Sequence, residues 1–428
     1  MFRTIIDAFK VKEIRKKILI TLLLLLVYRI GCWIPCVGFS TDAIFANSSG
    51  FGFFELMNMV SGGALQNCSV LALGVSPYIT ASIVIQLLTV AIPSLERLSK
   101  SGEDGRKKIS FYTRIAALVL AVAQAIGIVV SYSSSIDANL SGMPVWLVGC
   151  GVVLIMTAGA MFTVWIGERI TDLGIGNGTS LLIFVGILSS AGTSISAIIE
   201  YCFVDITYIW YLVIFIVAVI AIFALIVFMD GGERRVQVQY AKQIKGRKMY
   251  GGQSNYIPIR INATGVMPII FATALITFPQ LIISIFWPDV TWYSDWLGTN
   301  SWLYIVLTSL LILVFAFFYS KISFNPDDVS KRIQQQGGFI PGIRAGKPTA
   351  EYLGKISNRV TLFGAIFLAV IALIPSLAFK AIGDYAGASI LINAFSATGL
   401  MIVVSTALEF EKQLSAQMYV RNHKGFLS

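Results

Sequence analysis

The side chains that most often carry enzymatic chemistry are scarce in this sequence. There is a single histidine, His423, near the C-terminal end. A histidine-based metal site or a Ser-His-Asp triad is therefore nearly excluded. No glycine-rich stretch ends in the Gly-Lys-Ser/Thr of a phosphate-binding loop, so the sequence gives no sign of a nucleotide site of that kind.

The cysteines offer one redox alternative. Cys32 and Cys36 could form a redox pair, although the sequence has no CxxC motif. Free cysteine also behaves as a small hydrophobic side chain, and this is the favoured interpretation here. The five cysteines are Cys32, Cys36, Cys68, Cys150 and Cys202.

Polar amides inside apolar stretches are the remaining candidates. Gln86, Gln124 and Asn262 each lie within a long apolar segment. A buried amide in hydrocarbon needs a partner, and one interhelical hydrogen bond contributes about 0.6 kcal/mol. Ordinary helix-helix contact is an equally open interpretation. Charged residues are almost absent from the middle of these segments, which argues for a passive, apolar path rather than an ion-coupled carrier.

The elements that must position these residues are membrane spans. Hydrophobic residues make up 56% of the 428 residues and charged residues 13%, whereas a soluble domain has about 25% charged residues. The sequence predicts an all-α polytopic membrane protein, with about 20 residues for each span. The apolar run of the first segment is too long for a cleaved signal peptide. The ten predicted spans are 18–36, 70–92, 111–131, 145–167, 180–199, 208–229, 261–286, 302–323, 358–378 and 387–408.

The basic residues predict the orientation of these spans. Of the 32 Lys and Arg residues, 30 lie in the N-terminal stretch, in alternate loops or in the C-terminal tail. Only Arg29 and Lys380 lie elsewhere. Because basic residues concentrate on the cytoplasmic side, we expect both termini in the cytoplasm.

Two of the cytoplasmic loops, 230–260 and 321–357, are long and rich in turn residues. They alternate β-branched and charged residues or are punctuated by Gly and Pro, which predicts ordered protrusions with hairpin or turn chemistry. We favour docking of a partner protein over simple contact with lipid headgroups.

Irregular stretches interrupt the apolar pattern at two corresponding places. A short amphipathic piece with Glu55 and Asn58 precedes the second span. It could rest at the outer interface or fold back into a cavity. Pro77 and Pro268 interrupt the second and seventh spans early in each, which fits an inverted repeat with a functional seam. Simple tolerance of Pro in membrane helices is the alternative interpretation.

At this point several long motifs resemble a known family. They are "NMVSGGALQNCSVLALGVSPYITASIVIQLL", "GERITDLGIGNGTSLLIF", "GGERRVQVQYAKQIKGRKMYGGQSNYIPIRINATGVMPIIFA" and "FNPDDVSKRIQQQGGFIPGIRAGKPTAEYL". These resemble the SecY family, the central subunit of the bacterial protein-conducting channel, in order and over essentially the whole chain.

The resemblance implies ten helices in two inverted halves around an hourglass pore. The halves would be residues 1–200, with a short plug helix at 53–65, and residues 206–428. The implied function is passage of unfolded secretory polypeptides across the bacterial plasma membrane and sideways release of signal sequences and membrane segments into lipid. The resemblance implies no enzymatic activity and no cofactor. The implied partners are SecE, SecG, the motor ATPase SecA, the ribosome and nascent chains.

The resemblance also assigns residues to the pore. The plug would close the outer funnel, with Gly62-Gly63 as a permissive hinge. Its residues are Phe54, Glu55, Leu56, Met57, Asn58, Met59, Val60, Ser61, Gly62 and Gly63. A ring of side chains would form the constriction and gate ions by dewetting. The ring residues are Val75, Ile79, Thr179, Ile183, Ile270 and Ile402. Thr179 stands where the family usually has an aliphatic residue.

Two further sets follow from the same resemblance. Thr80, Gln124 and Asn262 would form a polar latch across the lateral opening. Basic residues of the two long loops would dock the motor or the ribosome, whose RNA offers phosphates. These docking residues are Arg234, Arg235, Lys242, Arg247, Lys248 and Arg344.

Two alternative functions remain open. A divergent accessory translocon with few substrates fits the same motifs. A secondary transporter of small solutes would share the inverted repeat, but it would normally carry acidic residues inside its spans.

Overall fold

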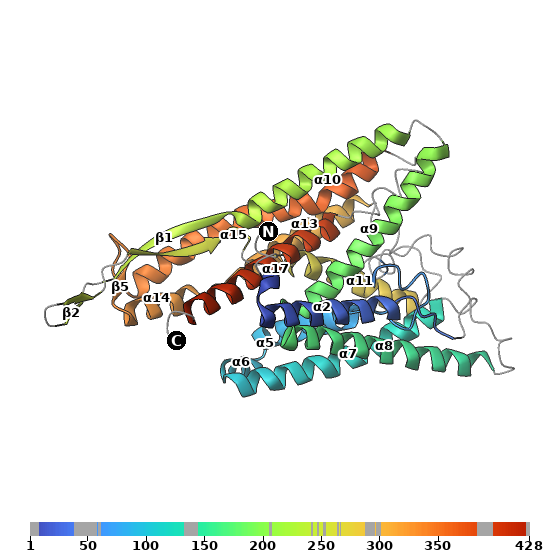
Figure 1. Cartoon of the computed structure of the whole chain (residues 1–428), viewed down its shortest axis with the longest axis horizontal. Coiled ribbons are helices and arrows are strands. Elements are labelled where there is room, and N and C mark those ends of the chain that lie inside the picture. The colour runs from blue at the N-terminus through green and yellow to red at the C-terminus, as the bar shows by residue number, and fades with distance from the viewer. Residues whose placement is uncertain are drawn as a thin grey trace.

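Long helices dominate the structure, a computed structural model in which the strands of the described residues lie at one end (Figure 1). The described residues are 8–37, 58, 61–131, 144–204, 208–240, 243–245, 248–250, 254–262, 265, 267–286, 296, 301–382 and 397–424.

Five long helices lie in the first half of the chain. They are α2 (Lys12–Gly31), α5 (Ser76–Ala91), α7 (Glu103–Ser131), α8 (Val145–Leu173) and α9 (Gly178–Val204). The short helix α6 (Pro93–Lys100) follows α5 after a bend of 103°. Helix α8 contacts α2, α7 and α9, and α7 contacts α5, so these helices form one packed group.

Five more long helices lie in the second half. They are α10 (Tyr208–Gly231), α11 (Met267–Phe286), α13 (Trp302–Ser323), α15 (Lys347–Ile382) and α17 (Ala397–Lys424). Helix α13 packs between α11 and α15, and α17 contacts both α10 and α15. The two groups meet where α7 contacts α11 and where α9 contacts α17.

Each of the ten predicted spans overlaps one of these helices. The match is closest for α13, whose bounds equal the predicted span 302–323. The last predicted span overlaps α17 from Ala397 onward. By length and composition alone, four of the described helices are able to cross a membrane, and the bent pair α5 and α6 would be a fifth. The four are Glu103–Val130, Val145–Leu173, Trp302–Gln335 and Lys347–Ile374.

The prolines predicted to interrupt the second and seventh spans instead lie at helix starts. Pro77 is in the first turn of α5, and Pro268 is the second residue of α11. Proline has no N–H and a fixed φ, which suits the first turn of a helix. Residues 61–75, before α5, form turns rather than the first part of a span. The prediction of broken spans was therefore wrong, although the two positions still correspond.

The two long loops form one small sheet at the end of the molecule that is far from the α9–α10 connection (Figure 1). Strands β1 (Glu233–Tyr240) and β4 (Ser254–Arg260) are antiparallel, and β5 (Gly338–Phe339) from the other loop pairs with the far end of β1. A second hairpin pairs β2 (Gln243–Lys245) with β3 (Lys248–Tyr250). The predicted hairpin chemistry is confirmed, but the joining of the two loops was not predicted.

Aliphatic side chains hold this sheet on the helices beneath it. Alternation along β1 buries Val236 and Val238 and exposes their neighbours. Helix α14 (Pro326–Gln335) begins at Asn325, whose side chain caps it by accepting from the Asp327 N–H. The "sheet cluster" consists of the buried residues Val236, Val238, Ile259, Ile333, Ile340 and Leu353.

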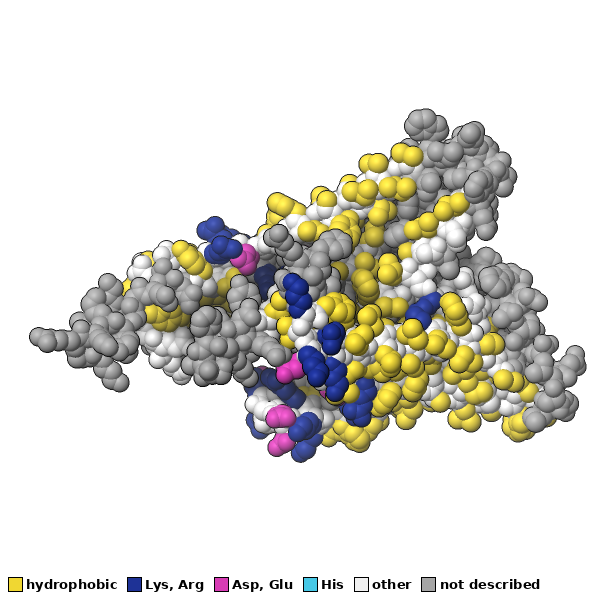
Figure 2. Space-filling model, viewed as in Figure 1, with side chains coloured by type: hydrophobic (Ala, Val, Ile, Leu, Met, Phe, Trp, Pro, Cys, Tyr) yellow, Lys and Arg dark blue, Asp and Glu magenta, His cyan; other side chains and the backbone are white. Residues whose placement is uncertain are grey.

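Exposed side chains divide the surface by type. In the view of Figure 2, Lys and Arg gather around α6, whereas the surface of α7 and α8 beyond them is largely apolar. The exposed basic residues of this region are Arg97, Lys100, Arg106, Lys107, Lys108 and Arg114. An apolar surface bounded by basic residues is what a helix bundle in a bilayer requires.

Candidate pore and lateral seam

Five of the six predicted ring residues come together in one apolar cluster. Val75, Ile183 and Ile402 are buried, and the partly buried Ile79 and Ile270 pack against them. They belong to the N-terminal end of α5 and to α9, α17 and α11. We call these five residues the "waist cluster". Their convergence from four helices distant in sequence is the arrangement that the ring prediction requires.

Local structure explains why α5 supplies two of them. Val75 is the N-cap residue of α5, and its carbonyl accepts the Ile79 N–H at 3.0 Å. Residues four apart share one helix face, so both side chains point the same way. Pro77 fixes the start of the helix between them. The turn before α5 therefore sets the position of two ring side chains at once.

Thr179, the sixth predicted ring residue, has other contacts. Its hydroxyl donates to the Asn177 side chain at 2.8 Å, and its backbone N–H donates to the same oxygen at 3.2 Å. Its methyl group faces α8 closely enough that a Cβ at Gly167 would lie 3.3 Å from it. These contacts give Thr179 a role at the N-terminal end of α9.

Some residues around the waist cluster were missed from the sequence. Ile187 is buried in the same cluster and lies one turn beyond Ile183 on α9. The i, i+4 spacing was a signal that could have identified it. Ala64, at the end of the predicted plug, and Leu71, in the turns that follow, are also buried there. Nothing in their residue types separates them from other small or apolar residues.

A second apolar cluster continues from the waist between the two groups of helices. Ile79 of α5 and Ile270 of α11 pack against both clusters. From there the contact runs along α5, α11 and α13 through Ile83, Phe271 and Phe315. We call this region, where α5 and α7 face α11 and α13, the "seam". It is the place where the family resemblance puts a lateral opening.

A polar contact between described residues crosses the seam. The Tyr319 hydroxyl of α13 donates to the Gln86 side-chain oxygen of α5. The Gln86 nitrogen donates to Ser82 Oγ at 3.2 Å, which fixes the orientation of the amide. The Tyr319 ring stacks on Phe271 of α11 with centroids 4.7 Å apart. Because the surroundings are apolar, either polar group would lack a partner if the helices separated.

The predicted latch residues are not joined by hydrogen bonds in the part of the chain that is described. The Thr80 hydroxyl donates to the Ser76 carbonyl of its own helix. Gln124 is buried on α7, and its side-chain oxygen has no partner among the described residues. The Asn262 amide donates to Asp230 Oδ1 at 3.0 Å, within the second helix group. Among the described residues, Gln86 and Tyr319 make a polar contact across the seam that the predicted latch residues do not make.

The predicted plug lies partly outside the described residues, which omit 51–57, 59 and 60. Local hydrogen bonds hold the described part together. The Asn58 carbonyl accepts the Gly63 N–H at 2.9 Å and the Ser61 hydroxyl at 3.2 Å. Asn58 Oδ1 accepts the Gln66 N–H at 3.1 Å. Gly62 and Gly63 both have positive φ, of 73° and 85°, a conformation that glycine adopts readily. Their role as a hinge stays a prediction.

The described cysteines fit the interpretation as small hydrophobic residues. Cys32, Cys36 and Cys68 are buried and free, and they belong to apolar clusters around α2 and the turns before α5. Cys150 is exposed. The Cys36 N–H donates to the Cys68 carbonyl at 2.7 Å, so the end of α2 is tied to these turns through the backbone.

The predicted docking residues fall in the small sheet and the turn beside it. Arg234, Arg235 and Arg344 are exposed, and Arg235 forms an ion pair with Glu233 at 2.7 Å. The Arg344 carbonyl accepts the Thr349 hydroxyl at 2.7 Å, which shapes the turn before α15. Lys248 is in β3, and Lys242 and Arg247 lie outside the described residues.

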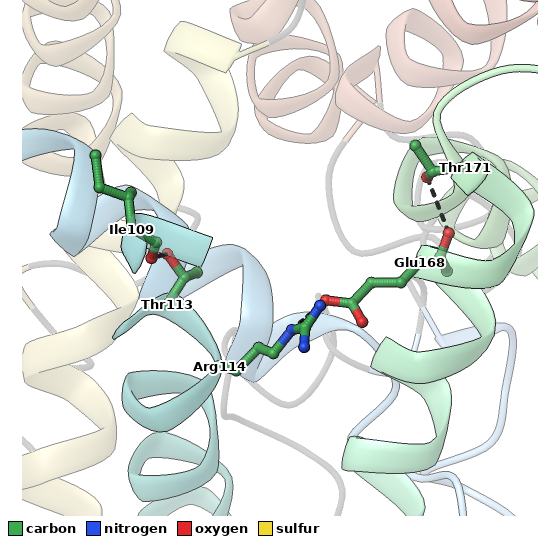
Figure 3. A network of polar contacts seen from close by, with 6 residues as sticks. Ile109, Thr113, Arg114, Glu168 and Thr171 are labelled. Atoms are coloured by element: carbon green, nitrogen blue, oxygen red, sulfur yellow. Dashed lines mark hydrogen bonds and ion pairs between the residues drawn. The ribbon is translucent and has the colours of Figure 1, made fainter. Parts of the chain in front are cut away.

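Polar contacts also connect helix ends near the basic turn of α6 and α7. Arg114 Nε of α7 lies 2.7 Å from Glu168 Oε1 of α8, as Figure 3 shows. Thr113 and Thr171 donate back to carbonyls of their own helices. On α6, the hydrogen bond from Lys100 lowers the pKa of the Glu96 carboxyl. These exposed pairs orient side chains and add little stability.

Comparison with known proteins gives concordant results. A family model described as SecY matches residues 69–411. Protein translocase subunit SecY of Streptomyces lividans is 41% identical over 445 residues, which cover 100% of both chains. A solved structure of a protein-conducting channel has a TM-score of 0.67 at 19% identity and covers 95% of this chain and 94% of that one. A structure of a SecY protein, whose plug domain stabilises the closed state of the translocation channel and maintains a membrane seal, has a TM-score of 0.64 at 18% identity with the same coverage.

Proposed function

Because the chain belongs to the SecY family, we propose that it is the central subunit of a channel that passes unfolded secretory polypeptides across the plasma membrane. It is a multi-pass membrane translocase subunit and not an enzyme, by family membership. Energy would come from a partner ATPase, from the ribosome or from the proton-motive force.

The observation that carries the proposal is the waist cluster. Aliphatic side chains from α5, α9, α11 and α17 meet at one place where the two helix groups adjoin. An apolar constriction offers no ligand to an ion and disfavours a column of water. The same side chains make no specific contact with a polypeptide. Such a constriction can therefore admit chains of any sequence and still hold back ions.

Sideways release would use the seam. The waist cluster and the seam share Ile79 and Ile270, so a chain at the waist would lie next to the contact that must part. A signal sequence would leave because its Leu and Ile residues gain about 0.3–0.6 kcal/mol each on insertion into lipid. The latch of Thr80, Gln124 and Asn262 is replaced in this proposal by the Gln86–Tyr319 bond.

The two halves would be residues 1–200 and 206–428. In support, helices α2–α9 pack mainly on one another, and so do helices α10–α17. The predicted plug at 53–65 would close the channel from the outer side at rest. The SecY relative whose plug maintains a membrane seal supports this assignment.

The charge distribution supports an orientation with both termini in the cytoplasm. The small sheet would then face the cytoplasm and dock SecA or a translating ribosome through Arg234, Arg235 and Arg344. SecE and SecG would complete the membrane complex, as the family resemblance implies. Nascent secretory and membrane proteins would be the substrates.

Crosslinking from a stalled export intermediate tests the channel. A photoreactive residue would replace Ile79, Ile183 or Ile270, one at a time, in cells that depend on this chain for export. We expect crosslinks from all three positions to the stalled polypeptide. Ile259 of the sheet cluster, which is equally aliphatic and buried, is the matched control and should give none. A stalled polypeptide that never contacts the three waist positions would refute the proposal.

A further inference from the structure

Arg29 connects three parts of the molecule that are distant in sequence. It lies in the last turn of α2, within a predicted span that is otherwise apolar. Its Nη1 donates to the Gly62 carbonyl at 3.2 Å. Its Nη2 donates to the Ser189 hydroxyl of α9. The two nitrogens of one partly buried guanidinium thus join α2, the C-terminal end of the predicted plug, and α9.

Gly62 packs so closely against Arg29 that a side chain at this position would clash. A Cβ at this position would lie 2.4 Å from Arg29 Nη1, 2.9 Å from the Gly186 carbonyl oxygen and 3.0 Å from Gly186 Cα. Gly63, the next residue, has a similar positive φ, but a Cβ there would meet nothing within 4 Å. The two glycines of the hinge are therefore unequal. Gly62 is seated between α2 and α9, and Gly63 faces open space.

Hydrogen bonds tie Gly62 and its neighbours into one turn. Ser61, Gly63 and Gln66 are hydrogen-bonded to Asn58. The Ser61 carbonyl also lies 3.8 Å from the Cys32 sulfur of α2, which donates to it. Ser61 and Cys32 are both almost fully buried. A shift of Gly62 would therefore carry this turn away from α2 and uncover Cys32.

We propose that Arg29 is a positioning residue that clamps the hinge of the plug to α2 and α9 in the closed channel. This inference rests on the proposed function. An ionisable residue in a membrane span is costly and generally has a function. Here the guanidinium holds a backbone carbonyl and a hydroxyl through two nitrogens of one rigid fork. Opening would require both hydrogen bonds to be released together.

A simpler interpretation is that Arg29 only balances the helix dipole at the end of α2. Lysine would serve that purpose equally well, because it keeps the positive charge. Lysine has a single ammonium on a flexible stem and lacks the planar fork that joins two acceptors in fixed geometry. The variant Arg29→Lys therefore distinguishes a role in holding the two acceptors from a role that needs only the positive charge.

The test measures how often the turn leaves α2, using Cys32 as a native reporter. Membranes holding the channel complex would be treated with a membrane-impermeant maleimide, and labelling of Cys32 would be measured by mass spectrometry relative to the exposed Cys150. For Arg29→Lys we expect labelling to rise about tenfold, which corresponds to about 1.4 kcal/mol. Ion leakage through the resting membrane should rise with it.

Two matched pairs sharpen the result. Gly62→Ala should uncover Cys32 as Arg29→Lys does, whereas Gly63→Ala, with the same strain in φ but no clash, should stay near wild type. Ser189→Ala should loosen the turn, whereas Ser189→Thr keeps the acceptor and should not. If Arg29→Lys reduces the amount of inserted protein, Ser189→Ala gives the test with the charge intact.

Different results would refute the clamp and the proposed function. Wild-type labelling and leakage in both Arg29→Lys and Gly62→Ala would overturn the clamp, even if the chain supports export. Failure of the unmodified chain to support export in cells depleted of their own translocase would overturn the proposed function. Labelling of Cys32 in the folded complex is measured independently of export.

Discussion

The waist cluster and the sheet cluster use the same aliphatic side chains at similar burial. Ile183 at the waist is 5% exposed and Ile259 in the sheet is 4% exposed. Their supports differ. The sheet cluster lies under β1 and β4, which are paired through seven residue positions. The waist cluster consists of side chains from four helices whose backbones are each satisfied within their own helix.

Under the proposed function, this difference would explain how the waist cluster opens while the sheet cluster stays closed. Separating the strands would break a ladder of backbone hydrogen bonds, each with a cost if it is left unmade. Among the described residues, separating the helices at the waist and the seam would break mainly apolar contacts, together with polar ones such as the Gln86–Tyr319 bond. Burial alone does not distinguish a core from a gate. The distinction lies in what else must break when the apolar side chains part.

The largest effect should come from a charge in the sheet cluster. Val238 is fully buried in the central strand, so Val238→Asp should cost more than about 4 kcal/mol and unfold the small sheet. Limited proteolysis of the cytoplasmic loops should become rapid, and export should stop. Gln237→Asp, at an exposed position of the same strand, should leave both unchanged. A protease-resistant sheet in Val238→Asp would show that the sheet cluster tolerates disruption without unfolding, contrary to the proposed difference from the waist cluster.

A charge reversal on the surface of this region should stop export without unfolding it. Arg344→Glu places a carboxylate on the exposed turn before α15, where it would repel an acidic or phosphate-bearing partner. We expect export to fall to background while inserted protein and protease resistance stay normal. Lys355→Glu, an exposed charge reversal on α15, is the control. Normal export by the Arg344 variant would show that docking does not use this residue.

Polar substitution at the waist should loosen the closed channel without unfolding the protein. Ile183→Ser removes about 2 kcal/mol of apolar burial, which would shift the balance between closed and open states by about thirtyfold. The resting membrane should leak ions, measured in vesicles, while the protein remains inserted. The matched variant Ile259→Ser should instead make the cytoplasmic loops sensitive to protease and leave the membrane tight. Identical behaviour of the two variants would show that the waist cluster and the sheet cluster do not differ in this way.

The sequence predicted the parts of the molecule that depend on local patterns. The apolar run from Trp302 to Ser323 fixes α13, and Ser301 caps its start by accepting from the Leu303 N–H. Five of the six residues assigned to the aliphatic ring by motif resemblance come together in one apolar cluster, and their role in a constriction stays a prediction. Pro77 was misjudged because a proline in an apolar run reads equally as a kink or as a helix start.

Features that depend on distant pairing could not be predicted. Strands β1 and β5 pair across about 100 residues, and two glycines in β5's turn give no hint of that partner. The seam contact is similar, because an amide such as Gln86 specifies that a partner exists without specifying which one. Arg29 stood out from the sequence as a basic residue away from the cytoplasmic loops, but its two acceptors come from segments far along the chain.

The smallest effect should come from removal of a single tyrosine hydroxyl. A Tyr–Gln hydrogen bond occurs both at the seam and beside the small sheet, so the two can be compared. Tyr319 bonds Gln86 across the seam, and Tyr240 bonds Gln336 at 3.4 Å beside the sheet. Tyr319→Phe should ease opening by about 0.6 kcal/mol, or about threefold, so weakly hydrophobic signals should gain more export than strong ones. Tyr240→Phe removes the same hydroxyl where nothing must open, and the ratio of weak to strong signals should not change. An equal ratio in the two variants would mean that the seam opens without regard to this bond, and its apolar contacts alone would then set the threshold for a signal sequence.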